Sequence, residues 1–269
     1  MNNLTKRVLS AVVLVPPVIG VVFFAPPWAM HIVIGLLAAL AGYEYGNITL
    51  KGRFQMYRVL MALTSSFCAL SVSLWPALPW APLAAMGLVS MLYPIAFMFG
   101  RSELKNSVPA AAFGAAGSFY TGALVGFIGL LYVSQPNGGH WVFSLLFGTF
   151  FGDTAAYTAG RIAGRRKLAP RISPGKTWAG AVGGLVGTCA AFAISKLFLL
   201  TDLSWAEVFI LAVPTSVACQ VGDLAESFLK RGFGVKDSGR LIPGHGGILD
   251  RIDALMFGAP IVFLFSLLR

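Results

Sequence analysis

Long apolar segments limit what this chain can fold into more than any other feature of its sequence. About 20 apolar residues are enough to cross a bilayer as a helix, and such segments recur along the whole chain. Hydrophobic residues make up 57% of the 269 residues and charged residues only 11%, so one soluble core could not hide the apolar surface from water. Unpaired backbone groups are costly in lipid, and the segments lack the alternation of barrel strands. The sequence therefore predicts an all-α, polytopic integral membrane protein.

Nine segments are predicted to span the membrane, and the basic residues support this count. Lys and Arg collect in short loops on the cytoplasmic side. Every basic residue except Lys196 and Arg269 falls in alternate connecting segments, which predicts a cytoplasmic N-terminus and an outside C-terminus. We expect a single membrane domain, with N-terminal helices in 1–106 and a catalytic region in 107–269. The predicted spans are 8–25, 29–49, 57–75, 80–99, 109–133, 141–160, 178–200, 205–226 and 251–268.

Acidic residues inside apolar segments are candidates for function, because ionisable groups are expensive in a membrane. Asp153 lies in the sixth segment, and Asp223 and Glu226 lie near the end of the eighth. The spacing of Asp223, Glu226 and Lys230 places all three on one helix face. Both segments run from outside to inside in the predicted topology, so these groups are expected near the cytoplasmic surface.

Asp250 and Asp253 begin the ninth segment from the same side, and two interpretations compete for them. Carboxylates at the start of a helix cap its first N–H groups and complement its dipole. Alternatively, they form a divalent cation site with Asp223, since Mg²⁺ takes a few carboxylate oxygens together with substrate phosphates. Three acids that reach one membrane face from different helices favour the cation site.

A basic segment between the sixth and seventh spans ends in "SPGKT", residues 173–177. A glycine-containing turn before a helix presents free N–H groups to an anion, and Lys176 adds a positive charge. The spacing does not match the phosphate-binding loop of nucleotide triphosphatases. Two interpretations therefore remain: a phosphate site, or an ordinary loop in which Ser173 or Thr177 caps the next helix.

A polar stretch between the eighth and ninth spans, "KDSGRLIPGHGGILDRID" at 236–253, differs sharply from its apolar surroundings. Its glycines allow the backbone to approach a ligand closely. Three roles are open for His245: a general base, a hydrogen-bond donor to phosphate, or a structural loop residue. A plain connector needs no such mixture of basic, acidic and glycine residues, so this stretch is the strongest candidate for a site.

The same stretch resembles the signature of the phosphatidate cytidylyltransferase family, also called CDP-diacylglycerol synthases. Two upstream segments also resemble segments of that family: "FGD", which ends at Asp153, and "SPGKTWAGAVGG", which begins at Ser173. Members of the family have eight to ten membrane helices. The matching positions read Ser227-x-Leu229-Lys230-Arg231-x₄-Lys236-Asp237-x-Gly239-x₂-Ile242-Pro243-x-His245-Gly246-Gly247-Ile248-x-Asp250-Arg251-Ile252-Asp253.

The resemblance implies that CTP and phosphatidic acid react to give CDP-diacylglycerol and pyrophosphate. It also implies Mg²⁺, a second, monovalent cation such as K⁺, and a homodimer, with no nucleic-acid partner. The expected location is a bacterial inner membrane with the active site facing the cytoplasm. Family acids bind metal at the positions of Asp223 and Asp250, and we extend this expectation to Asp153 and Glu226.

Both substrates are polyanions, so the site should be rich in basic groups and metal ligands. The expected catalytic residues are Asp223, Asp250, Lys236 and Arg251. The expected substrate-binding residues are Ser173, Lys176, Lys230, Arg231, Asp237, Arg240, His245 and Asp253.

Two other functions are compatible with the same features. In an ion-coupled transporter the intramembrane acids would bind the ion, but the acids cluster toward one face and no inverted repeat is visible. A CTP-dependent lipid kinase would share the metal and the basic groups but not the full pattern of 227–253.

Overall fold

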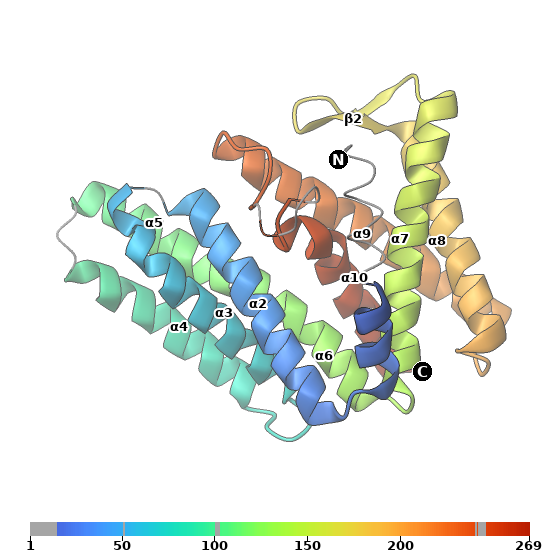
Figure 1. Cartoon of the computed structure of the whole chain (residues 1–269), viewed down its shortest axis with the longest axis horizontal. Coiled ribbons are helices and arrows are strands. Elements are labelled where there is room, and N and C mark those ends of the chain that lie inside the picture. Colours follow the sequence, from blue (N-terminus) through green and yellow to red (C-terminus); the bar gives the residue numbers. More distant parts are fainter. Residues whose placement is uncertain (1–14, 51, 100–102, 240, 242–245) are drawn as a thin grey trace. The chain divides into compact units, whose positions relative to one another are not determined.

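A computed structural model of the chain describes residues 15–50, 52–99, 103–239, 241 and 246–269. Most of these residues are helical, in agreement with the predicted all-α membrane protein (Figure 1). The chain forms two compact units. Unit 1 comprises Met1–Ser134 and Asp237–Arg251, and unit 2 comprises Gln135–Lys236 and Ile252–Arg269. The predicted division of function between 1–106 and 107–269 stays a prediction.

Among the described residues, seven helices are long and apolar enough to cross a membrane. They correspond to seven of the nine predicted segments. Of the first segment, only the short apolar helix Val15–Phe24 is described. The sixth forms a helix of 26 residues, Gly138–Ala163, but is not one of the seven. The seven are Pro27–Thr49, Phe54–Ser73, Ala81–Met98, Leu104–Ser134, Trp178–Phe198, Trp205–Gly232 and Leu249–Leu268.

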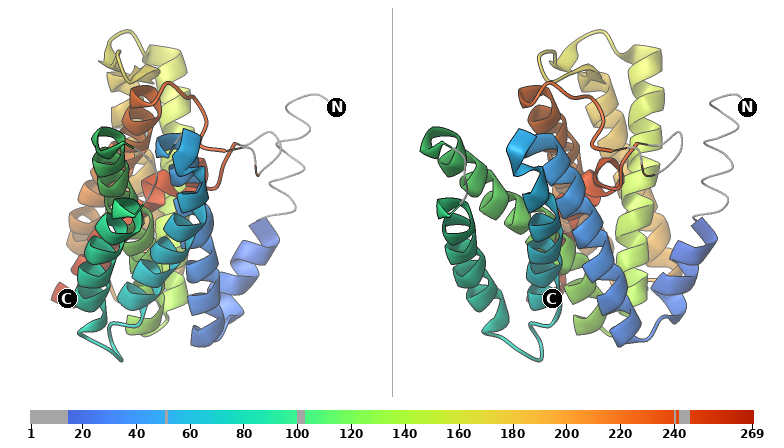
Figure 2. Two further views of the ribbon diagram at one scale, coloured as in Figure 1. Left: turned by 90° about the vertical axis from the view of Figure 1, so that its left-hand side faces the viewer. Right: turned by 60° about the vertical axis from the view of Figure 1, so that its left-hand side comes forward.

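Unit 1 is a bundle of helices around α3, which contacts α2, α4, α5 and α6 (Figure 2). The π-helical turn η2 joins α5 and α6 into one span. The elements are α2 (Pro27–Thr49), η1 (Gly52–Met56), α3 (Tyr57–Ser73), α4 (Ala81–Met98), α5 (Leu104–Ser118), η2 (Phe119–Ala123) and α6 (Leu124–Ser134).

Close approach of backbones and a few buried hydroxyls hold this bundle together. A Cβ atom at Gly126 would lie 2.7 Å from the carbonyl oxygen of Ala69 on α3, so only glycine fits there. Without a hydrophobic force between helices in lipid, small residues and interhelical hydrogen bonds provide the packing. The buried Thr64 hydroxyl lies 2.9 Å from Tyr93 Oη and 2.7 Å from Ser118 Oγ, which links α3, α4 and α5.

Unit 2 contains α7 (Gly138–Ala163), a hairpin of β1 (Lys167–Ala169) and β2 (Ser173–Thr177), α8 (Trp178–Phe198) and α9 (Trp205–Gly232), together with most of α10 (Leu249–Leu268). The antiparallel hairpin is a difference from the predicted loop, and it pairs Lys167 with Thr177. Thr177 then caps α8, because its hydroxyl accepts a hydrogen bond from the N–H of Gly180 at 3.1 Å.

Charged groups separate toward the two ends of unit 2. At the hairpin end, Lys176 contacts Asp223 near the end of α9. At the opposite end, Lys196 lies over the ring of Trp205, 5.3 Å from its centroid, and Arg269 pairs with Glu207. The two basic residues that the topology prediction placed apart from the others thus lie together, at the end of unit 2 without the hairpin.

Candidate active site

An ion pair joins the hairpin of unit 2 to α9. Lys176 Nζ lies 2.7 Å from Asp223 Oδ2, and the two side chains are 26% and 39% exposed. The strand β2 aims the lysine, and the last third of α9 carries the aspartate. Both charges keep access to solvent, so each can exchange its partner for a charged ligand at modest cost.

Two N–H groups in the first turn of α8 already have hydrogen-bond partners within the protein. The N–H of Trp178 donates to the carbonyl of Arg166 at 3.0 Å, and the N–H of Gly180 donates to the Thr177 hydroxyl. Of the two sequence interpretations of "SPGKT", the helix cap by Thr177 is therefore present. Ser173 lies at the start of β2 and is partly exposed.

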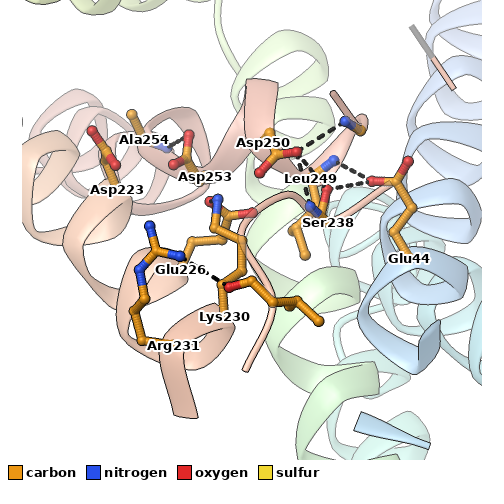
Figure 3. A network of polar contacts seen from close by, with 12 residues as sticks. Glu44, Asp223, Glu226, Lys230, Arg231, Ser238, Leu249, Asp250, Asp253 and Ala254 are labelled. Carbon is orange, nitrogen blue, oxygen red and sulfur yellow. Dashed lines mark hydrogen bonds and ion pairs between the residues drawn. The ribbon is translucent and has the colours of Figure 1, made fainter. Parts of the chain in front are cut away.

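A second ion pair on α9 is much more buried. Lys230 Nζ lies 2.6 Å from Glu226 Oε2, and their side chains are 11% and 1% exposed (Figure 3). The i, i+4 spacing creates this contact, in agreement with the shared helix face that the sequence predicted for these residues. Removal of either partner would leave a buried charge, which is strongly destabilising.

Arg231 connects the end of α9 to the hairpin by hydrogen bonds. Its Nη1 donates to the carbonyl of Val235 at 3.1 Å, and its Nε donates to the carbonyl of Ile172 at 3.4 Å. The guanidinium is nevertheless exposed. It therefore reaches the same solvent-facing region of unit 2 as the hairpin.

A further acid of unit 2, Asp253, lies near Asp223. Asp253 on α10 is 8% exposed, and its Oδ1 accepts the N–H of Ala254 at 2.8 Å (Figure 3). It lies within electrostatic reach of both Asp223 and Asp153, the latter an exposed residue of α7. The close packing of Gly222 brings α9 and α10 together, since a Cβ there would lie 2.5 Å from the carbonyl oxygen of Asp253.

The described residues contain no group of three His, Cys, Asp or Glu side chains placed to hold a metal ion. The expected metal ligands Asp153, Asp223, Glu226 and Asp250 therefore stay a prediction. The donors nevertheless fit Mg²⁺, because carboxylate oxygens are hard ligands and this ion usually takes one or two of them with water and substrate phosphates. Asp223 fits best, since a cationic group already lies against its carboxylate.

Glu44 of α2 is a candidate site residue that the sequence did not indicate. Its carboxylate is 4% exposed and receives three hydrogen bonds within unit 1 (Figure 3). Oε1 accepts the N–H of Ile248 at 3.0 Å, and Oε2 accepts the N–H of Leu249 at 2.9 Å and the hydroxyl of Ser238 at 2.9 Å. The available signal was its position inside an apolar span, to which the rule on intramembrane charges applies equally.

Asp250 lies in the first turn of α10 and holds the loop that precedes it. Its Oδ2 accepts the N–H groups of Ser238 at 3.0 Å and of Gly247 at 2.9 Å, and lies 3.0 Å from Ser238 Oγ. The contact with Gly247 holds the residue two positions before α10 and does not cap the first N–H groups of the helix. Its expected role as a metal ligand stays a prediction.

The glycines of the polar stretch pack directly against these carboxylates. A Cβ at Gly239 would lie 2.5 Å from Glu44 Oε1, and one at Gly247 would overlap both Glu44 Oε2 and Ser238 Oγ. Gly246 has a φ of 79°, which other residues rarely adopt. The sequence predicted close approach to a ligand, and in the structure these glycines approach the protein's own acids.

The remaining expected site residues are partly described. Lys236, Asp237 and Arg251 are exposed. Arg240 and His245 lie outside the described residues, so their predicted roles are not addressed by the structure.

These features define a class: an integral membrane protein of apolar helices that carries exposed basic groups and carboxylates where its helices end. Comparison with known proteins narrows this class. The chain belongs to the Cytidylyltransferase family, whose pattern it matches over residues 5–268.

Similar proteins share one name, phosphatidate cytidylyltransferase. The protein of that name from Haemophilus influenzae is 33% identical over 297 aligned residues, which cover 96% of each chain. The one from Staphylococcus saprophyticus is 34% identical over 85% of this chain and 89% of its own. The one from Brucella suis is 45% identical over 152 residues, and this match spans 56% of the length of each protein.

Proposed function

We propose that this chain transfers CMP from CTP to phosphatidic acid, giving CDP-diacylglycerol and pyrophosphate for phospholipid synthesis. The observation that carries the proposal is the similarity to the Haemophilus influenzae phosphatidate cytidylyltransferase, which extends over 96% of both chains. The signature at 227–253 supports it, because many of the matched positions are charged or glycine residues at fixed spacing.

The proposed reaction needs charge neutralisation more than proton transfer. A phosphate oxygen of phosphatidic acid attacks the α-phosphorus of CTP, the new P–O bond forms, and the bond from the α-phosphorus to the bridging oxygen breaks. The electron pair of that bond leaves with pyrophosphate. Because the attacking phosphate is already anionic, no strong base is required, and catalysis comes from positioning and electrostatic stabilisation.

Basic side chains are the groups that the proposal assigns to the phosphates. Lys176 is held by an exposed carboxylate and can turn to a phosphate, whereas Lys236 and Arg251 are already exposed. Arg231 lies at the exposed end of α9, beside the hairpin that carries Ser173. The further substrate contacts proposed from the family signature are those of Lys230, Asp237, Arg240, His245 and Asp253.

Asp223 and Asp250 would hold Mg²⁺, and Asp153 and Glu226 are proposed only as supporting acids. When bound, the cation would neutralise charge on the triphosphate and on the departing pyrophosphate. The partly exposed carboxylate of Asp223 suits this role. The proposals of a second, monovalent cation and of a homodimer rest on the family resemblance alone.

The proposed topology has nine membrane helices, an N-terminus in the cytoplasm, and an active site that faces the cytoplasm from a bacterial inner membrane. The alternation of basic residues along the chain supports this orientation. The chemistry agrees with it, since CTP is a cytoplasmic substrate while the acyl chains of phosphatidic acid stay in the leaflet.

Labelled CTP tests the proposed function. Purified protein in vesicles is incubated with phosphatidic acid, Mg²⁺ and CTP that carries a radioactive label on either the α- or the γ-phosphate. The proposal predicts that only α-label enters the lipid phase, and only when phosphatidic acid is present. Lipid that gains only γ-label would identify a lipid kinase, and the absence of either label from lipid would leave an ion-coupled transporter; both results contradict the proposal.

A further inference from the structure

We propose that Glu44 is a positioning residue for the reaction: it holds the start of α10 and, through Ser238, sets the position of Asp250. This inference rests on the proposed function for its kinetic consequences. The hydrogen bonds on which it depends are features of the structure itself.

Glu44 caps a helix that is distant in sequence. The first N–H groups of an α-helix have no partner within it, and negative charge at this end complements the helix dipole. Here the N–H groups of Ile248 and Leu249, at the start of α10, donate to the two oxygens of the Glu44 carboxylate. A residue of α2 thus fixes where α10 begins, although some 200 residues separate them.

Ser238 connects this cap to Asp250. Its Oγ lies 2.9 Å from Glu44 Oε2 and 3.0 Å from Asp250 Oδ2, and a hydroxyl has a single proton to donate. Its backbone N–H donates to Asp250 at 3.0 Å. A displacement of Glu44 would therefore move Ser238 and the start of α10 together, and both determine where the Asp250 carboxylate lies.

The Glu44 carboxylate and Ser238 are tightly packed. Ser238 is 4% exposed, and a Cβ at Gly239 or Gly247 would collide with the Glu44 carboxylate. At 4% exposure Glu44 itself does not reach substrate, so its effect must pass through Asp250. Residues that orient a metal ligand in this way typically change metal affinity or activity about 10- to 100-fold when mutated.

The test compares Glu44→Gln with wild type. Glutamine has the same shape, but its NH₂ group would face an N–H or O–H donor instead of accepting from it. We expect the Mg²⁺ concentration for half-maximal turnover to rise about tenfold and kcat to fall about tenfold or more. We also expect faster amide hydrogen exchange in residues 246–251, a readout that requires neither metal nor substrate.

Thr64→Val serves as the matched control. It also removes a buried, hydrogen-bonded polar group from unit 1, but one that contacts Tyr93 and Ser118 instead of the polar stretch. It should lower thermal stability without changing the Mg²⁺ requirement or exchange at 246–251. Ser238→Ala tests the connection from Glu44 through Ser238 to Asp250, and it should also raise the Mg²⁺ requirement. If the two residues act together, Glu44→Gln should raise the Mg²⁺ requirement less in the Ser238→Ala protein than in the wild-type protein.

Two results would overturn the inference. One is unchanged exchange at 246–251 in Glu44→Gln. The other is faster exchange with wild-type Mg²⁺ dependence, which would reduce Glu44 to a structural cap. If Glu44→Gln does not fold, Ser238→Ala decides, and an unchanged Mg²⁺ requirement in that variant overturns the inference. A different result would refute the proposed function and leave the cap of α10 by Glu44 intact: wild-type protein that shows the expected amide exchange at 246–251 but forms no CDP-diacylglycerol.

Discussion

Two acids of unit 1 and two acids of unit 2 are held in different ways. In unit 1, Glu44 and Asp250 accept hydrogen bonds from backbone N–H groups and from Ser238, and Glu44 is almost fully buried. In unit 2, Asp223 and Glu226 pair with lysine ammonium groups. The first arrangement fixes the backbone around the carboxylate, whereas the second neutralises charge with a side chain that can rotate away.

The two arrangements suit different functions. A carboxylate held by backbone donors cannot change partners unless the loop moves, so it suits the placement of other groups. A partly exposed pair such as Lys176–Asp223 can open, which would offer the lysine to a phosphate and the aspartate to a cation. The Glu226–Lys230 pair is similar in chemistry but is buried, so we expect it to stabilise α9 more than to exchange partners.

Asp250→Asn should have the largest effect, because it removes a proposed metal ligand and an anchor of the loop at once. We expect kcat/KM to fall about 10³-fold, the upper range for loss of one electrostatic group in an active site. Asp202→Asn, an exposed acid in the turn before α9, is the control and should retain full turnover. Transfer within tenfold of wild type in a folded Asp250→Asn protein would remove Asp250 from the site.

Lys230→Met should have the next largest effect, on stability. It leaves the Glu226 carboxylate buried without its ammonium partner, and breaking a buried pair typically costs about 3–5 kcal/mol. Thermal unfolding in detergent measures the loss, with Lys176→Met as the exposed counterpart that should cost far less. The double variant Glu226→Gln/Lys230→Met should regain most of the stability; no recovery would contradict the paired-charge interpretation.

Asp223→Asn should lower turnover about 100-fold while the protein remains folded. Its carboxylate is partly exposed and its pair with Lys176 is open to solvent, so little stability depends on it. Steady-state formation of CDP-diacylglycerol and thermal unfolding, measured on the same sample, separate the two effects. An equal loss of stability and activity would place Asp223 with the structural acids of unit 1.

Lys236→Ala should have the smallest effect. The side chain is exposed, and its proposed role is to attract the anionic substrates. We expect kcat/KM to fall several-fold, on the order of one lost surface charge contact, and the loss to shrink at high salt. Lys196→Ala, at the opposite end of unit 2, should change nothing, and an identical salt response in both variants would argue against a site role for Lys236.

Much of this arrangement could be predicted from the sequence. Apolar length located seven spans, and the spacing of Glu226 and Lys230 placed them on one helix face, where the structure shows them in contact. Turn chemistry identified Thr177 as one of two possible caps. These features are local, so a few neighbouring residues determine them.

The parts that could not be predicted depend on contacts between distant segments. Nothing near Glu44 in the sequence shows that Ser238 and Leu249 will surround it. The hairpin was missed because β1 has only three residues and no alternating apolar pattern. The glycines of the polar stretch, such as Gly247, were predicted to approach a ligand, since the sequence cannot show that a carboxylate from α2 lies against Gly247.

The central claim of the comparison is that Asp223 exchanges Lys176 for a divalent cation. Mn²⁺ binding to purified protein without nucleotide, followed by electron paramagnetic resonance, tests it most directly. Because the ammonium competes with the cation for one carboxylate, Lys176→Ala should bind Mn²⁺ at least as tightly as wild type, whereas Asp223→Asn should bind about tenfold more weakly or worse. Wild-type affinity in Asp223→Asn, or weaker binding in Lys176→Ala, would contradict the claim.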